Sequence, residues 1–142
     1  MACLILVAAA FSFYFSTSSS RESTATRSAP AKSESATVDA ATQAVASEFS
    51  RRLDYYGGRL RSLKIERGRV IAEWESSKCD YLQAEITDLA ISINRGYKSR
   101  VEALDVVRAC DSDTTRHAIS GARFERYRSG EIGDREFLEG IE

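Results

Sequence analysis

One histidine, three cysteines and a scattered set of carboxylates are the side chains in this sequence that could build a reactive or metal-binding site. His117 is the histidine, and it directly follows Arg116. A catalytic triad or a Cys–His pair needs a second group within hydrogen-bond reach of the imidazole, and spacing along the chain identifies none. We therefore interpret His117 as an exposed surface side chain.

The carboxylates offer two further patterns for chemistry. Glu73, Glu75 and Asp80 are close enough in sequence for an acid–base pair, but we expect the polar face of their strand to be solvated. Asp111 and Asp113 form a short acidic pair that lacks the spacing of a calcium loop, and helix capping accounts for Asp113. We predict no catalytic residue, no metal site and no cofactor.

The cysteines suggest a structural bond. Cys3 lies in an apolar N-terminal run, which leaves Cys79 and Cys110 in the part that we expect to fold. In an exported domain these two could form a disulfide, closing a loop of about 30 residues and stabilising the fold by roughly 3–4 kcal/mol. The alternative is two separate buried thiols, because free cysteine behaves as a small apolar residue. No Cys-x-x-Cys spacing occurs, which excludes a zinc ribbon or a thioredoxin-like motif.

The charge balance argues against a nucleic-acid-binding function. The 142 residues carry 20 basic and 21 acidic side chains, a formal net charge of -1, whereas a phosphate-binding surface needs an excess of basic residues. Aromatic and basic residues interleave between Arg123 and Arg128, but Glu125 and the acidic stretch 131–142 oppose base stacking there. No glycine-rich segment ends in Gly-Lys-Ser/Thr, the signature of a phosphate loop. We expect neither nucleic acid nor a small-molecule substrate as the partner.

The first 20 residues have the composition of a membrane-targeting segment. Residues 2–15 are almost entirely apolar, and no charge occurs before Arg21. A membrane-spanning helix needs about 20 apolar residues, whereas a signal peptide has a shorter apolar region followed by small residues at its cleavage site. We predict that residues 1–20 are a signal peptide cleaved near Ser16–Ser18, or an uncleaved membrane anchor. Because no Lys or Arg precedes the apolar run, the topology stays open.

Residues 21–37 are rich in Ser, Thr and Ala and contain no large apolar side chain. Such a segment cannot bury enough apolar surface to offset the entropy lost on ordering. We predict a disordered linker there, followed by a globular domain over residues 38–142, where apolar periodicity begins. About 100 residues suffice for one modest hydrophobic core.

Apolar spacing predicts that this domain is α+β, of a small αββαβ type with C-terminal helices. Its first helix has Asp39 as the N-cap and ends at Gly57, which suits a left-handed C-cap. A β-hairpin follows, with strands over residues 60–66 and 70–75. Gly68 supplies the positive φ that a tight turn between them needs.

The second half of the domain is less regular. Residues 82–96 carry an apolar stripe at helical spacing. Residues 100–110 fit both a helix and a strand, and their valines favour a strand. That strand would return antiparallel to the helix and bring the two cysteines of the domain together. We expect a third helix capped by Asp113 and a short last helix capped by Asp134.

Two stretches, Leu63–Ala72 and Gly96–Val106, combine alternating apolar and polar residues with a glycine at a turn. With this arrangement residues 63–107, about a third of the chain, resemble the BON domain, a small α+β module of bacterial envelope proteins. Two features depart from the family's pattern: Trp74 stands near the place where the family often has a second glycine, and the intervening helix is slightly longer. The resemblance implies a non-enzymatic role at an envelope or lipid surface, and the family has no fixed catalytic residues to carry over.

The order of targeting segment, linker and domain predicts a non-enzymatic accessory domain, membrane-anchored or exported to the periplasm or another extracytoplasmic space. Its expected partner is a protein or the cell envelope. Phe137, Leu138 and Ile141, in the acidic C-terminal segment, are the predicted docking residues. Two alternatives stay open: a small enzyme with scattered carboxylates around His117, and an anchored regulator facing the cytoplasm, in which the cysteines would be free thiols.

Overall fold

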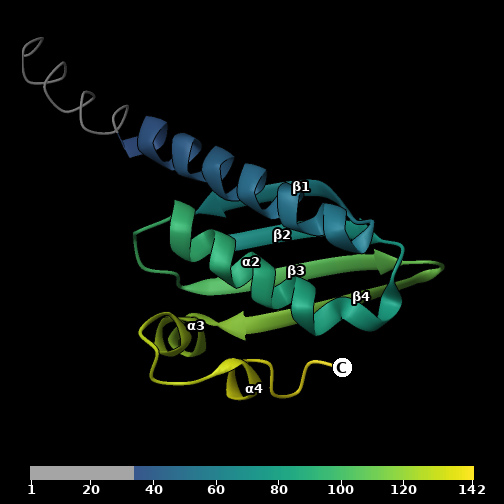
Figure 1. Ribbon diagram of the computed structural model, residues 1–142. Coiled ribbons are helices and arrows are strands. Elements are labelled where there is room, and N and C mark those ends of the chain that lie inside the picture. The colour runs from purple at the N-terminus through teal and green to yellow at the C-terminus, as the bar shows by residue number, and fades with distance from the viewer. Residues whose placement is uncertain (1–33) are drawn as a thin grey trace, which may run out of the picture. The chain divides into compact units, whose positions relative to one another are not determined.

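The computed structural model describes residues 34–142 (Figure 1). The predicted membrane segment, residues 1–20, and most of the predicted linker lie outside the described residues. A compact unit spans Val38–Glu142. Within the described part of the chain, no helix is long and apolar enough to cross a membrane.

The first helix includes residues 34–53 and buries Val45, Phe49 and Leu53 completely. It continues as the 3-10 turn η1, Asp54–Tyr56, and stops at Gly57, whose φ of 63° is the predicted left-handed C-cap. The predicted start was wrong, because Asp39 lies inside the helix and residues 34–37 of the expected linker are also helical. Alanine is abundant in this stretch, and its high helix propensity extends the helix beyond the apolar stripe.

The first hairpin is confirmed. Strands β1, Arg59–Glu66, and β2, Arg69–Ser76, pair antiparallel and leave a two-residue turn. Arg67 and Gly68 both have positive φ, 49° and 78°, as a type I′ turn requires. A Cβ on Gly68 would lie 2.9 Å from the Glu102 side chain and 3.0 Å from the Arg100 carbonyl oxygen, so glycine is needed for space as well.

The second helix, α2, is Leu82–Gly96, and its predicted apolar stripe is buried: Leu82, Ile86, Leu89 and Ile93. A 3-10 turn, η2, Cys79–Tyr81, leads into it. Tyr81 occupies the N-cap without a side-chain hydrogen bond, so the helix lacks the side-chain cap that the neighbouring Ser and Asp residues could have supplied.

The second hairpin corrects the sequence-based order of elements. Strand β3, Ala103–Cys110, is the strand expected over residues 100–110. Strand β4, Asp113–Ser120, replaces the start of the predicted third helix, because Thr and Ile at alternating positions favour a strand. The helix that follows, α3, Gly121–Arg128, begins only after Ser120, whose hydroxyl accepts a hydrogen bond from the Arg123 amide at 3.3 Å.

The four strands form one sheet in the order β1-β2-β3-β4. The outer pairs are antiparallel hairpins, and the central pair β2–β3 is parallel, so α2 is the crossover that a parallel pair requires. Residues 38–53 and α2 lie on the same face of the sheet (Figure 1). The last helix, α4, Asp134–Phe137, is a single turn with Gly133 rather than Asp134 as its N-cap.

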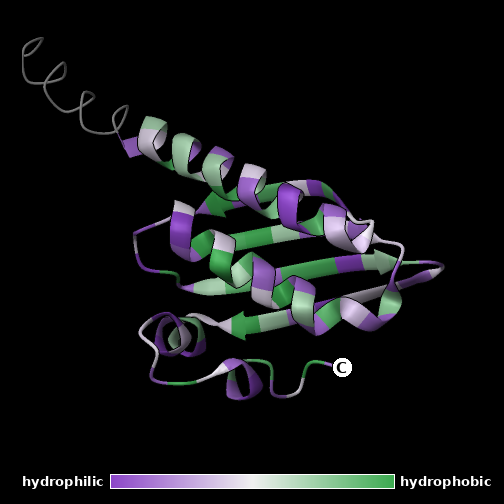
Figure 2. Cartoon of the chain, viewed as in Figure 1, coloured by the Kyte–Doolittle hydropathy of each residue, from purple (hydrophilic) through white to green (hydrophobic). Residues whose placement is uncertain are grey.

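The core lies between this face and the helices. Alternate residues of the central strands point into it, and these inward positions are apolar apart from Ser76 and Arg108 (Figure 2). Trp74 is fully buried and meets Phe49 edge to face at 5.2 Å between ring centroids. The side chains between these positions point to the other side of the sheet and lie outside the core.

Candidate functional site

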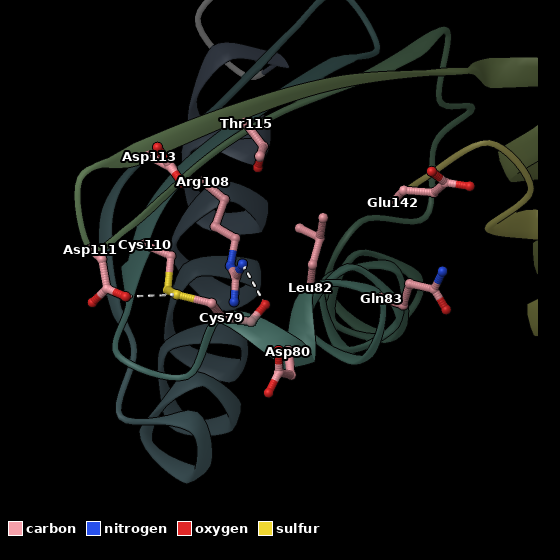
Figure 3. Close-up of a pocket in the computed structure, with 10 residues that line it drawn as sticks. All are labelled: Cys79, Asp80, Leu82, Gln83, Arg108, Cys110, Asp111, Asp113, Thr115 and Glu142. Carbon is pink, nitrogen blue, oxygen red and sulfur yellow. Dashed lines mark hydrogen bonds between the residues drawn. A yellow bond between two sulfur atoms is a disulfide. The ribbon is translucent and has the colours of Figure 1, made fainter.

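A cavity of about 370 Å³ lies beside the cysteine pair, between the start of α2, the β3–β4 hairpin and Glu142 (Figure 3). Its lining residues are Cys79, Asp80, Leu82, Gln83, Arg108, Cys110, Asp111, Asp113, Thr115 and Glu142. Most are polar or charged, so its chemistry depends on which of those groups are already bonded within the fold.

The two cysteines form the predicted disulfide. Their sulfur atoms are 2.02 Å apart and their Cα atoms 5.7 Å apart. Cys110 is buried at the end of β3, whereas Cys79 is exposed just before α2. Asp111, in a left-handed conformation with φ 53°, holds a carboxylate oxygen 3.3 Å from the Cys79 sulfur. A disulfide sulfur has no hydrogen to donate, so this contact becomes a hydrogen bond only in the reduced form.

Behind the disulfide lies a buried ion pair that the sequence reading missed. Arg108 Nε is 2.7 Å from Glu85 Oε2, and the side chains are 4% and 0% exposed. Glu85 also accepts hydrogen bonds from Trp74 Nε1 at 3.1 Å and from the Ser76 hydroxyl at 2.5 Å. The carboxylate is therefore surrounded by donors, as a buried charge must be.

The same ion pair limits what the cavity can bind. The two terminal nitrogens of Arg108 donate to the carbonyl oxygens of Lys78 and Cys79, at 2.7 and 3.0 Å. Its guanidinium is thus committed to the fold, and an anionic ligand would have to displace existing bonds. Of the described residues that line the cavity, none of the four carboxylates takes part in a salt bridge: Asp80, Asp111, Asp113 and Glu142.

The cavity also contains the one cluster of three potential metal ligands among residues 34–142. Cys79, Cys110 and Asp111 place their ligand atoms within 4.8 Å of one another. Metal binding by cysteine requires thiolates, and the disulfide removes both of them. In the oxidised protein, the Asp111 carboxylate is therefore the one group of this cluster that could bind a metal ion.

The structure separates the groups of the enzyme alternative. The prediction that His117 is an exposed side chain was wrong, because it is half-buried on the core side of β4, opposite Val106. Its Nε2 is buried without a hydrogen-bond partner. Glu73 and Glu75 lie on the other side of the sheet. Glu75 accepts a hydrogen bond from Arg61 at 2.5 Å, which lowers the pKa of its carboxyl group. These groups form no shared site.

The predicted docking residues are part of the core. Phe137 is fully buried, Leu138 and Ile141 are 9% and 4% exposed, and all three belong to the main apolar cluster. Phe137 stacks on Tyr127 with 4.3 Å between ring centroids. A partner could reach these side chains only after local unfolding, so we assign them to packing.

The outward side of the sheet, which we call the open face, is a better candidate surface. It comprises the alternate side chains of β2, β3 and β4 that point away from the core: Arg69, Ile71, Glu73, Glu75, Ala103, Asp105, Val107, Ala109, Thr114, Arg116, Ala118 and Ser120. Within residues 34–142, no helix lies over this face (Figure 1).

The outward side of the central strand β3 carries three small apolar side chains and one charge, Asp105, and further charged side chains flank it on β2 and β4. Val107 lies half-exposed on β3, paired in register with Glu73 on one side and Arg116 on the other. Arg69 forms an ion pair with Asp105 across β2 and β3. Glu73 and Arg116 have no salt bridge within the described part of the chain, although Glu73 lies close enough to Arg61 to attract it electrostatically. Neither side chain is therefore held in an ion pair that an external group would have to break.

No family model matches the chain, and neither curated proteins nor solved structures give a significant match. The resemblance to the BON domain therefore remains a prediction, and function has to be argued from the molecule itself.

Proposed function

We propose that this chain is a non-catalytic accessory domain that works outside the cytosol, held at a membrane or exported through its N-terminal segment, and that it binds a protein partner through the open face. One observation carries this proposal: one whole side of the sheet is left uncovered by residues 34–142, with half-exposed apolar side chains at its centre. A sheet face that no helix covers, with partly exposed apolar side chains on it, is a surface that can bind another molecule.

The composition of the open face favours a protein over the other partner classes. Ile71, Val107 and three alanines give a flat surface of small apolar side chains, and its one central charge, Asp105, is already paired with Arg69. The surrounding charges have both signs, which suits the mixed surface of another protein better than a phosphate backbone or an anionic lipid layer. No cavity is needed, because sheet faces bind by stacking on a second flat surface.

The disulfide supports the extracytoplasmic part of the proposal, because such bonds persist in oxidising compartments and are rare in the cytosol. Intact mass of the protein from its own host, alkylated without reduction, tests it. We expect Cys79 and Cys110 to escape alkylation. Alkylation of both in freshly lysed cells would instead favour the regulator that faces the cytoplasm.

Site-specific photo-crosslinking tests the binding surface. A photoreactive phenylalanine analogue at Val107, at the centre of the open face, should capture a partner in cells of the native host. The matched control is the same analogue at Tyr55, which is 74% exposed and belongs to η1 at the end of the first helix. Adducts from position 107 and none from position 55 support the proposal, whereas no adduct at 107, or equal capture at both, overturns it.

A further inference from the structure

We propose that the partner of the open face is a second copy of this chain, stacked sheet against sheet about a two-fold axis along β3, an inference that rests on the proposed function for its choice of surface. The observation behind it is the placement of two opposite charges. Glu73 and Arg116 flank Val107 on the neighbouring strands, in the same row of the sheet.

A two-fold axis along β3 makes this row complementary to itself. Rotation about the axis exchanges the positions above β2 and β4 and leaves the row unchanged. Glu73 of one copy then faces Arg116 of the other, Arg116 faces Glu73, and the two Val107 side chains meet on the axis. Neighbouring strands are about 4.8 Å apart and stacked sheets about 10 Å apart, so an extended Glu and Arg can span the gap.

The other rows fit the same axis. Ile71 of one copy faces Ala118 of the other, and Glu75 faces Thr114, because each pair shares a row through β3. Asp105 meets its own counterpart near the axis, a like-charge contact. Arg69 already binds Asp105 within each copy and offsets that repulsion. Small alanines at the remaining β3 positions permit close approach of the two sheets.

The size of the surface predicts a weak dimer. Three strands of eight residues cover roughly 14 by 26 Å. This flat area is below the ~800 Å² per partner of a standard interface. We therefore expect an equilibrium between monomer and dimer that shifts with concentration. Attachment to a membrane would raise the local concentration and favour pairing.

Charge reversal in the full-length chain tests the pairing, with sedimentation velocity as the measurement. Glu73→Arg and Arg116→Glu each create two like-charge contacts across the axis and should weaken dimerisation about tenfold. The double variant restores both pairs with the signs exchanged, and its Kd should return to within about threefold of the original. Glu66→Arg and Lys64→Glu are matched controls on β1. Their side chains point to the same side of the sheet but lie beyond the three strands that face each other, so Kd should change by less than about twofold.

Mixing the two single variants gives the sharpest result. A heterodimer of Glu73→Arg with Arg116→Glu regains both pairs, so native mass spectrometry should detect mixed dimers in preference to either homodimer. A monomer at every concentration, or a dimer that ignores both reversals, overturns this inference. If position 107 nevertheless crosslinks to a different protein, the proposed function survives with another partner; if it captures nothing, both proposals fail.

Discussion

Glu85 and Arg108 are the residues whose loss should most disturb this fold. Each charge is acceptable in the core only because of the other, since removing a charge from water costs several kcal/mol. Trp74 and Ser76 supply further donors to Glu85, and two backbone carbonyls accept from Arg108. The network links α2, the central strands and the segment before α2, so it specifies how the three elements fit together.

We predict that Arg108→Met destabilises the protein by about 3–5 kcal/mol, because it leaves the Glu85 carboxylate buried without its cation. Urea unfolding followed by tryptophan fluorescence measures the change. The double variant Glu85→Leu with Arg108→Met should regain much of the loss, because apolar side chains of similar size need no partner. A double variant as unstable as the sum of the two single variants would show that the residues are not coupled.

Tyr56 makes stability depend on alkaline pH. Burial, and then its hydrogen bond to Asp88 at 2.8 Å, raise the pKa of its hydroxyl from 10.0 to about 12. The folded state therefore keeps a proton that the unfolded state loses, and the stability present below pH 10 falls as pH rises from 10 to 12. Tyr127 behaves in the same way beside Asp134, also with a pKa of about 12.

The variant Tyr56→Phe should show a shallower loss of stability between pH 10 and pH 12 than the unchanged chain. Urea unfolding across that range measures the slope. Phenolate absorbance measured against pH provides the control. In the unchanged protein, part of the absorbance should appear only near pH 12, and this part should be smaller in the variant. Identical slopes would mean that Tyr56 ionises as freely in the fold as in the unfolded chain.

The sequence contains a signal for the buried ion pair. Glu85 falls among the apolar residues of α2 at helical spacing, and Arg108 falls among alternating apolar residues of β3. A charged residue on each of two apolar faces indicates a buried pair. The further hydrogen-bond donors to Glu85 could not be predicted from the sequence. Trp74 and Ser76 belong to β2, a third element whose position beside α2 depends on tertiary packing.

Helices and strands were predicted correctly where a short stretch of sequence determines the backbone conformation. The hairpin at Gly68 and the end of the first helix at Gly57 were predictable because each needs a positive φ at a position that glycine occupies. Strand β4 was mistaken for a helix because Asp113 resembles an N-cap. Its true character comes from pairing with β3, which is a contact between separate segments and leaves only a weak local pattern.

Two glycines with similar backbone angles separate conformational cost from packing cost. Gly68 and Gly130 have φ of 78° and 77°, but an added Cβ at Gly130 would meet no atom within 4 Å. We predict that Gly130→Ala costs about 1 kcal/mol, and that Gly68→Ala costs about 2–3 kcal/mol because the segment 100–102 must also move. Thermal unfolding of both variants measures the difference, and equal losses would show that this segment yields freely.

At the scale of the whole molecule, the disulfide holds together the one long-range connection of the sheet. Two hairpins form locally, but the parallel pair β2–β3 joins them only through α2. Cys79 follows β2 and Cys110 ends β3, so the bond closes the crossover itself. Parallel pairing at this distance along the chain carries a large entropic cost of loop closure, and the covalent bond reduces that cost.

We therefore predict that Cys79→Ser combined with Cys110→Ala lowers the free energy of unfolding by about 3–4 kcal/mol, as expected for the 31 residues that separate the cysteines. Hydrogen exchange should locate the effect. Amides in the β2–β3 pair should lose protection, while those in the β1–β2 hairpin should change less, because that hairpin is local. The unchanged protein under reducing conditions is the control and should behave like the variant. Uniform loss of protection across all four strands would show instead that the sheet opens as a single cooperative unit.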